Sequence, residues 1–127
     1  MTTEATTPSG LLDERLLDCI RSCAECAAAC GACAKQCAQA GDQAMARCIQ
    51  LCLDCATLCL ACIPLMARGS EQYKALCRLC AELCEQCANE CDSYDDDAMR
   101  ACAQACRQTA EKCRAMAGWH RGSRATR

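Results

Sequence analysis

Nineteen of the 127 residues are cysteine, and they form four runs in which the steps are three or four residues, apart from one step of seven across Thr109. A thiolate is a soft ligand that binds Cu(I), Zn(II) and iron–sulfur clusters, so the chemistry these side chains offer is metal binding. Alternating steps of three and four average 3.5 residues, which keeps one stripe of a helix facing its neighbours. All nineteen thiols are therefore predicted metal ligands on inward-facing seams. The runs are Cys19, Cys23, Cys26, Cys30, Cys33 and Cys37; Cys48, Cys52, Cys55, Cys59 and Cys62; Cys77, Cys80, Cys84, Cys87 and Cys91; and Cys102, Cys106 and Cys113.

Turn signals between the cysteine runs indicate four helices. Gly41 and Asp42 suit the end of one helix and the start of the next, because glycine favours a left-handed C-terminal cap and aspartate caps an N-terminus. Gly69 repeats this pattern after Pro64, which disturbs the last turn of the second helix. The acidic run 95–97 suits the start of the fourth helix. The sequence therefore predicts helices over residues 11–40, 43–66, 71–92 and 96–117.

Short connections make consecutive helices antiparallel, so we expect an all-α fold: an antiparallel up-down-up-down four-helix bundle with a cysteine-lined core. This bundle is predicted over residues 11–117, after a disordered N-terminal segment (1–10) and before a flexible basic tail (118–127). Counting back from each turn places the seam residues in matched levels of a thiol-lined tube about 20–27 Å long. The levels are Cys37, Cys48, Cys91 and Cys102; Cys33, Cys52, Cys87 and Cys106; Cys30, Cys55 and Cys84 with Thr109; Cys26, Cys59, Cys80 and Cys113; Cys23, Cys62 and Cys77 with Met116; and Cys19 with Met66, Tyr73 and His120.

Charge decides which metal such a core suits. Straight helices cannot wrap around an iron–sulfur cluster in the way that a ligand loop does. Zn(II) bound by four thiolates leaves about two negative charges per site, and each uncompensated buried charge is strongly unfavourable. Cu(I) is monovalent, so one ion per thiolate gives a neutral core. The cysteine count therefore predicts a capacity on the order of 19 Cu(I) ions per chain.

Candidate ligands for metal entry lie at one end of the predicted tube. Met116 and Met66 carry thioethers, which are soft ligands for Cu(I), and His120 is the only histidine of the chain. We expect these three residues to pass Cu(I) to the thiolates further in. Met45 and Met99 continue the stripe at the opposite end, where they serve either as further ligands or as ordinary apolar caps.

The composition argues against several partners and compartments. The net charge of −2 gives no electrostatic case for binding nucleic acid or an anionic membrane, and no uninterrupted apolar stretch is expected to approach the length of a membrane span. Residues 1–10 have neither the basic nor the apolar part of a secretory signal, so a cytoplasmic location with reduced cysteines is expected. The predicted helix 43–66 is apolar on both flanks of its cysteine stripe, which indicates a homo-oligomer.

Other functions fit the cysteine pattern less well. A di-iron site in a helix bundle uses inward-facing glutamate and histidine, whereas the inward positions here are cysteine. A catalytic thiol is one activated cysteine with a basic partner, whereas these nineteen are equivalent, so neither a catalytic residue nor an enzyme is predicted. Two alternatives to Cu(I) storage stay open, namely a thiol redox buffer and a zinc–thiolate store.

The repeated C-x-x-x-C and C-x-x-C pairs, beginning with Cys19–Cys23 and Cys23–Cys26, resemble those of the cytosolic branch of the bacterial copper storage proteins. The resemblance covers residues 11–117. It implies a cytosolic protein for copper storage and detoxification, assembled as a homotetramer, with Cu(I) entering at one end of the bundle. The chain departs from the full pattern at Thr109, which leaves one level with three thiols.

Overall fold

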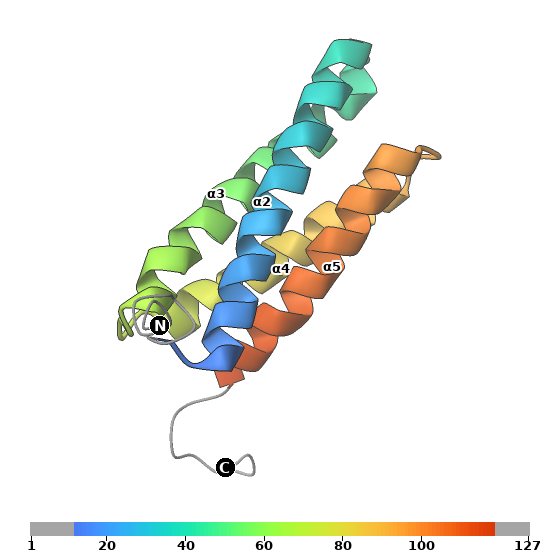
Figure 1. Cartoon of the computed structure of the whole chain (residues 1–127). Coiled ribbons are helices and arrows are strands. Elements are labelled where there is room, and N and C mark those ends of the chain that lie inside the picture. Colours follow the sequence, from blue (N-terminus) through green and yellow to red (C-terminus); the bar gives the residue numbers. More distant parts are fainter. Residues whose placement is uncertain (1–11, 119–127) are drawn as a thin grey trace, which may run out of the picture.

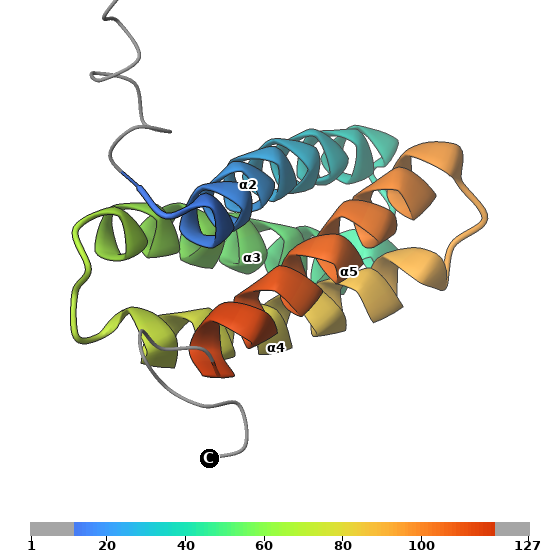
Figure 2. The same ribbon diagram turned by 60° about the horizontal axis from the view of Figure 1, so that its bottom comes forward.

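The structure is a computed structural model that describes residues 12–118. The regular elements of that part are the helices α2 (Glu14–Ala40), α3 (Ala46–Ala67), α4 (Tyr73–Asp92) and α5 (Asp97–Gly118), with one turn of 3₁₀ helix, η2 (Gln43–Met45), before α3. Consecutive helices run in opposite directions and lie side by side (Figure 1). Helix α2 also packs against α5, which closes the bundle (Figure 2). The predicted all-α, antiparallel up-down-up-down four-helix bundle is confirmed.

The capping residues expected from the sequence end and begin the helices. Gly41 ends α2 with a left-handed φ of 69°, and Asp42 accepts a hydrogen bond from the backbone N–H two residues further on at 3.0 Å. Gly69 follows α3 with a φ of 65°. Asp96 accepts a hydrogen bond from the Met99 N–H at 3.0 Å and so caps α5. These short turns hold consecutive helices in antiparallel contact.

The helix boundaries differ from the predicted ones by a few residues. Helix α2 begins at Glu14 rather than at residue 11, because Asp13 is its N-cap. The predicted helix 43–66 starts as η2, and α3 continues past Pro64 to Ala67. The predicted disordered segment 1–10 lies outside the described residues, as does the predicted tail apart from Gly118, which ends α5.

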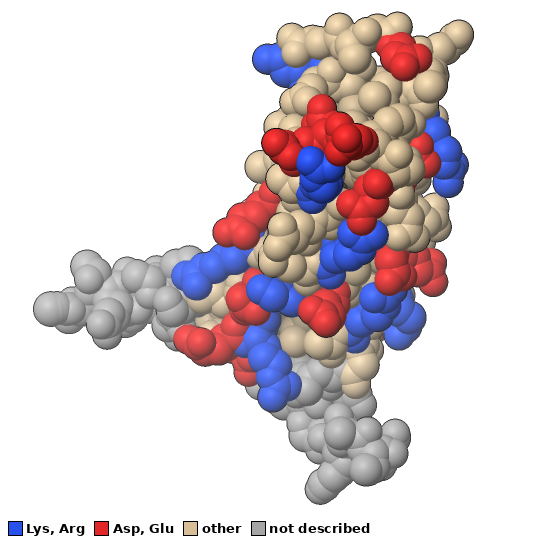
Figure 3. Space-filling model, turned by 90° about the vertical axis from the view of Figure 1, so that its right-hand side faces the viewer, with Lys and Arg blue, Asp and Glu red and all other residues tan. Residues whose placement is uncertain are grey.

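The core of the bundle consists mainly of cysteine. All nineteen cysteine side chains are at most 2% exposed, and Met66, Met99 and Met116 are buried with them. The outer face shown in Figure 3 carries Lys and Arg interleaved with Asp and Glu. One ion pair on the surface of the bundle joins Arg107 on α5 to Asp92 on α4. Exposed ion pairs contribute little to stability, so burial of the cysteine seams holds the four helices together. The predicted cysteine-lined core is confirmed.

The predicted levels are correct between neighbouring helices that are joined by a turn. Cys37 on α2 lies 3.9 Å from Cys48 on α3, and Cys48 lies 3.7 Å from Cys91 on α4, measured between Sγ atoms. The Sγ atoms of Cys91 and Cys102 belong to one group within 4.8 Å. A tight turn fixes the offset between two helices, so counting from it gives the correct partners.

The predicted levels are wrong between α5 and α2. Cys106 lies 3.6 Å from Cys30, about one turn nearer the start of α2 than its predicted partner Cys33. Cys113 is shifted in the same direction and contacts Cys23 at 3.9 Å. No turn joins α2 to α5, so side-chain packing sets their relative position and the sequence pattern alone does not report it.

Helix α3 is more apolar than the sequence analysis allowed. The stretch Gln43–Ala67 has a mean hydropathy of 1.9 over its most apolar window and is, by length and composition, long enough to cross a membrane. Arg47, Gln50 and Asp54 interrupt this stretch, so it passes by its average hydropathy and is not an uninterrupted apolar run. A core helix of a bundle passes the same test, and α3 places its cysteine stripe in the core. Its other side is exposed, with Leu53 at 53% and Leu60 at 54%.

Candidate metal centre

Helices α3 and α4 face each other through a ladder of paired thiols. Their 3.5-residue spacing puts every seam position of one helix opposite a seam position of its antiparallel neighbour. The Sγ–Sγ distances of the four rungs are 3.7 Å for Cys48–Cys91, 3.6 Å for Cys52–Cys87, 3.3 Å for Cys55–Cys84 and 3.7 Å for Cys59–Cys80. The ladder supplies one wall of the predicted tube.

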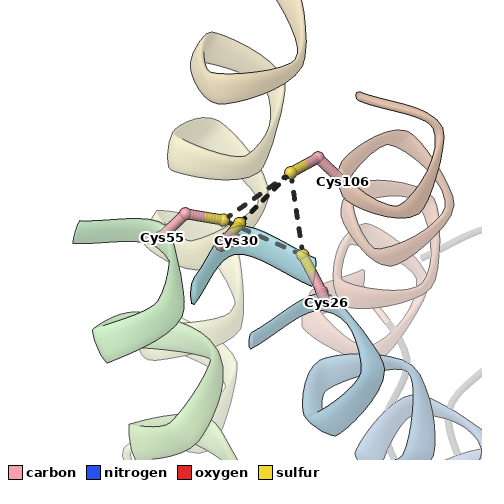
Figure 4. A group of neighbouring side chains, drawn as sticks. All are labelled: Cys26, Cys30, Cys55 and Cys106. Atoms are coloured by element: carbon pink, nitrogen blue, oxygen red, sulfur yellow. Dashed lines mark hydrogen bonds between the residues drawn. The ribbon is translucent and has the colours of Figure 1, made fainter. Parts of the chain in front are cut away.

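Helices α2 and α5 bring further thiols against this wall. Figure 4 shows Cys26 and Cys30 from α2, Cys55 from α3 and Cys106 from α5, with their sulfur atoms directed toward one another. The Sγ of Cys106 lies 3.7 Å from that of Cys26 and 4.0 Å from that of Cys55. All four sulfurs lie within 4.8 Å of one another and all four side chains are buried. This arrangement is a closed group of four soft ligands.

The four-thiol group of Figure 4 is one of a series that overlaps along the bundle. Cys26 and Cys55 belong to a second group of four, and Cys52 and Cys102 are likewise shared by two groups. A thiolate shared in this way is placed to bridge two ions. Besides the group of Figure 4, sets with all sulfurs within 4.8 Å of one another include Cys26, Cys55, Cys59 and Cys84; Cys30, Cys52, Cys87 and Cys102; Cys33, Cys52, Cys91 and Cys102; and Cys19, Cys23 and Cys113.

The sulfur spacing suits thiolate-bound metal ions. Metal–thiolate bonds of about 2.3 Å place two sulfurs on one ion roughly 3.8–4.0 Å apart. The shortest Sγ–Sγ contacts between helices lie from 3.3 Å to 4.0 Å, so these ligands stand close to their binding separation before any ion enters. Every member of the five groups is cysteine, a donor set that favours soft ions such as Cu(I) over Mg²⁺ or Ca²⁺.

A comparison with protein families identifies the relatives of this chain. Residues 12–118 match the family model for copper storage proteins. The chain belongs to the copper storage protein family.

Solved structures of similar proteins share the fold. Apo-Csp3, copper storage protein 3 from Bacillus subtilis, is 40% identical with a TM-score of 0.74, covering 79% of this chain and 96% of that one. The Cu(I)-bound copper storage protein BsCsp3 is 38% identical with a TM-score of 0.77, covering 82% and 99%. The Nmul_A1745 protein from Nitrosospira multiformis is 37% identical with a TM-score of 0.76, covering 84% and 97%. A search of curated proteins gave no match.

The protonation of the thiols in this copper storage protein is set by burial and by the neighbouring sulfurs. Burial raises the pKa of Cys48 above its ordinary value of 9.0. S–H donation from Cys106 and Cys26 lowers the pKa of Cys55, because it stabilises the thiolate, while the contact with Cys102 raises the pKa of Cys106. A thiolate therefore forms only where its neighbours keep their protons. Each incoming Cu(I) then replaces a proton and leaves the core neutral.

The candidate entry residues are placed at the ends of the bundle. Met66, near the end of α3, is 1% exposed, and Met116, near the end of α5, is 3% exposed. Both helices end where α2 begins, as Figure 1 shows. Met99 is buried at the opposite end, and Met45 there is half-buried against the core. His120 lies outside the described residues.

One polar contact inside this core was not predicted from the sequence. Thr109 does not face Cys30 across the tube, as its predicted level required, because α5 is shifted by about one turn. Its hydroxyl lies 2.7 Å from the hydroxyl of Ser22 on α2. Ser22 stands outside the 3.5-residue cysteine repeat, so only its position beside Cys23 hinted that it is buried.

Proposed function

We propose that this chain is a cytoplasmic copper store that holds on the order of one Cu(I) ion per cysteine, with all nineteen thiolates as ligands. The observation that carries the proposal is the series of overlapping, buried groups made of cysteine alone. One monovalent ion per thiolate leaves no net charge in the core, whereas four-thiolate Zn(II) sites leave about two negative charges each. Storage of this kind removes free copper and also retains it for later supply.

An anaerobic titration of the reduced protein with Cu(I) tests this function. Binding is expected to continue to about 19 ions per chain, with one proton released per thiolate, because each ion replaces a proton. Zn(II) is expected to saturate at fewer ions and to be displaced by Cu(I). A control sample in which the cysteines are alkylated should bind neither metal. A Cu(I) plateau at four or five ions would contradict the proposal and favour discrete tetrahedral sites.

Location, assembly and lack of catalysis belong to the same proposal. A reducing cytoplasm suits nineteen closely spaced thiols, since an oxidising compartment promotes disulfides. The exposed apolar side of α3 supports a homo-oligomer, which we propose to be a tetramer. It includes Leu60 and a surface pocket lined by Ile49 and Leu53, and burial of such a face against another copy stabilises an assembly. We assign no catalytic residue, because the thiol contacts within residues 12–118 are to other thiols, whereas a catalytic cysteine is activated by a basic partner.

Copper is proposed to enter at the end of the bundle where Met66 and Met116 lie, with His120 as a further ligand. Thioethers bind Cu(I) more weakly than thiolates and so let an ion move inward. Replacing Met116 and His120 together by alanine is expected to slow loading severalfold while total capacity barely changes. Stopped-flow loading followed by ultraviolet thiolate–Cu(I) absorption measures both. Replacing Met45 and Met99 is the matched control at the other end, and a slower rate there alone would place entry at that end.

A further inference from the structure

One seam position in the core of the bundle carries a hydroxyl in place of a thiol. Thr109 stands on α5 between Cys106 and Cys113 and is 1% exposed. Its hydroxyl donates to the backbone carbonyl of Ser22 at 3.1 Å, and the Ser22 hydroxyl, 2.7 Å away, donates to it in return. Each hydroxyl has one proton to donate, so the two groups satisfy each other across the contact between α2 and α5.

The hydroxyl pair interrupts the sulfur contacts on this side of the core. On one side of it Cys30 contacts Cys106 at 3.6 Å, and on the other Cys23 contacts Cys113 at 3.9 Å. The two α5 thiols are seven residues apart, or about 10 Å along the helix, roughly twice the usual step between thiols. Neutral hydroxyl oxygens are poor ligands for Cu(I), and these two are already hydrogen-bonded. A Cu(I) ion therefore cannot bridge Cys106 and Cys113 directly.

The thiols beyond the interruption include a group of three. Cys19, Cys23 and Cys113 have their sulfurs within 4.8 Å of one another, at the end of the bundle where α3 and α5 finish with Met66 and Met116 (Figure 1). The other three helices keep an unbroken cysteine seam past the level of the hydroxyl pair, through Cys23 and Cys26 on α2, Cys59 and Cys62 on α3, and Cys77 and Cys80 on α4. The connection between this terminal group and the centre therefore runs along α2, α3 and α4, and α5 is the helix that offers no thiol at this level.

We propose that the Ser22–Thr109 pair divides the copper store into a terminal three-thiolate site that exchanges Cu(I) rapidly and a central reservoir that exchanges slowly. Cys19, Cys23 and Cys113 hold the terminal ions, and the two hydroxyl residues position the boundary. In each inward step a bond from Cu(I) to a terminal thiolate breaks as a bond to a central sulfur forms. The proton of the receiving thiol passes to the vacated thiolate, and no electron is transferred. This inference rests on the proposed function.

Removal of Cu(I) from the fully loaded protein by an excess of a Cu(I) chelator tests the division. The parent chain is expected to lose about three ions in a fast phase, one for each terminal thiolate, and the remainder at least tenfold more slowly. Thr109→Cys completes the α5 seam, so the slow phase should accelerate severalfold and the capacity should rise by about one ion. Cys113→Ser should reduce the fast phase and leave the rate of the slow phase unchanged.

Two variants at the same position separate the role of the thiol from that of the hydroxyl. Thr109→Ser keeps the hydrogen bonds and should behave as the parent. Thr109→Val removes them without adding a ligand, so it should keep both phases and the capacity but lower the melting temperature of the metal-free protein. Full capacity with single-phase removal from the parent would overturn the division and leave the storage function intact. Parent-like kinetics for Thr109→Cys would also overturn it, whereas failure to bind Cu(I) at all would overturn the storage function.

Discussion

Replacing Cys26 and Cys55 together by serine is expected to weaken the binding of several Cu(I) ions. The loss should exceed the two ions whose charge the two missing thiolates would have balanced. Both thiols belong to two of the four-thiol groups, so their removal leaves incomplete ligand sets on both sides. Serine offers a neutral oxygen, which is a poor ligand for Cu(I). We expect capacity to fall by about two ions and the affinity of several neighbouring ions to fall at least tenfold, as measured by competition with a Cu(I) chelator.

The matched control is the double substitution of Cys19 and Cys37, which lie at opposite ends of the core. Their nearest sulfur contacts are each 3.9 Å, to Cys113 and Cys48. This variant should also lose about two ions but should retain the affinity of the central ions. Far-UV circular dichroism of both metal-free variants checks that the helices are intact. Equal affinity losses for the central and the terminal pair would show that the central thiolates do not bridge neighbouring ions.

The free energy of unfolding of the metal-free protein is expected to fall as the pH rises above about 9. Burial raises the pKa of Cys48 above 9.0, and contacts with Cys102 and Cys26 raise those of Cys33 and Cys84. The unfolded chain loses these protons first, so this stabilisation is complete below pH 9 and is lost as the pH rises toward the folded-state values. Each thiol that stays protonated only in the folded state lowers the free energy of unfolding by about 1.4 kcal/mol for every pH unit of increase.

Urea unfolding under anaerobic, reducing conditions at pH 7, 8, 9 and 10, followed by circular dichroism, measures this loss. The fully Cu(I)-loaded protein is the control, because its thiolates have no protons left to release and its stability should change little. Equal midpoints for the metal-free protein at pH 8 and pH 10 would contradict the prediction. That result would mean that the buried thiols ionise as readily as exposed ones.

Much of the fold was predictable because its signals are local. The 3.5-residue spacing of cysteine identifies the inward face of each helix, and residues such as Gly41, Asp42 and Gly69 mark the turns through backbone geometry that depends on the residue itself. Short turns also fix the offset between consecutive helices, which is why the α3–α4 ladder has the rungs that counting predicted. The rungs of that ladder follow from these two facts.

The position of α5 against α2 was not predictable in the same way. These helices are far apart in the chain, and every cysteine on one offers a similar partner to several cysteines on the other. A seam of nearly identical side chains does not distinguish one register from another a turn away. The contact between Ser22 and Thr109 does distinguish them, because it pairs the hydrogen bonds of buried hydroxyls only in the observed register. Its two residues carry no sequence signal that links them.

The cysteine seams of this bundle also determine how copper capacity scales with chain length. A hollow protein cage stores ions in a lumen, so its capacity increases with the cube of its diameter. Here each ion needs its own thiolate on a helix, and capacity increases linearly with the length of the bundle. One more heptad in each of the four helices would add two seam positions per helix, or about eight thiols, for an extension of about 10 Å. Longer or shorter helices with unbroken seams would therefore change the capacity without any change in the cross-section of the bundle.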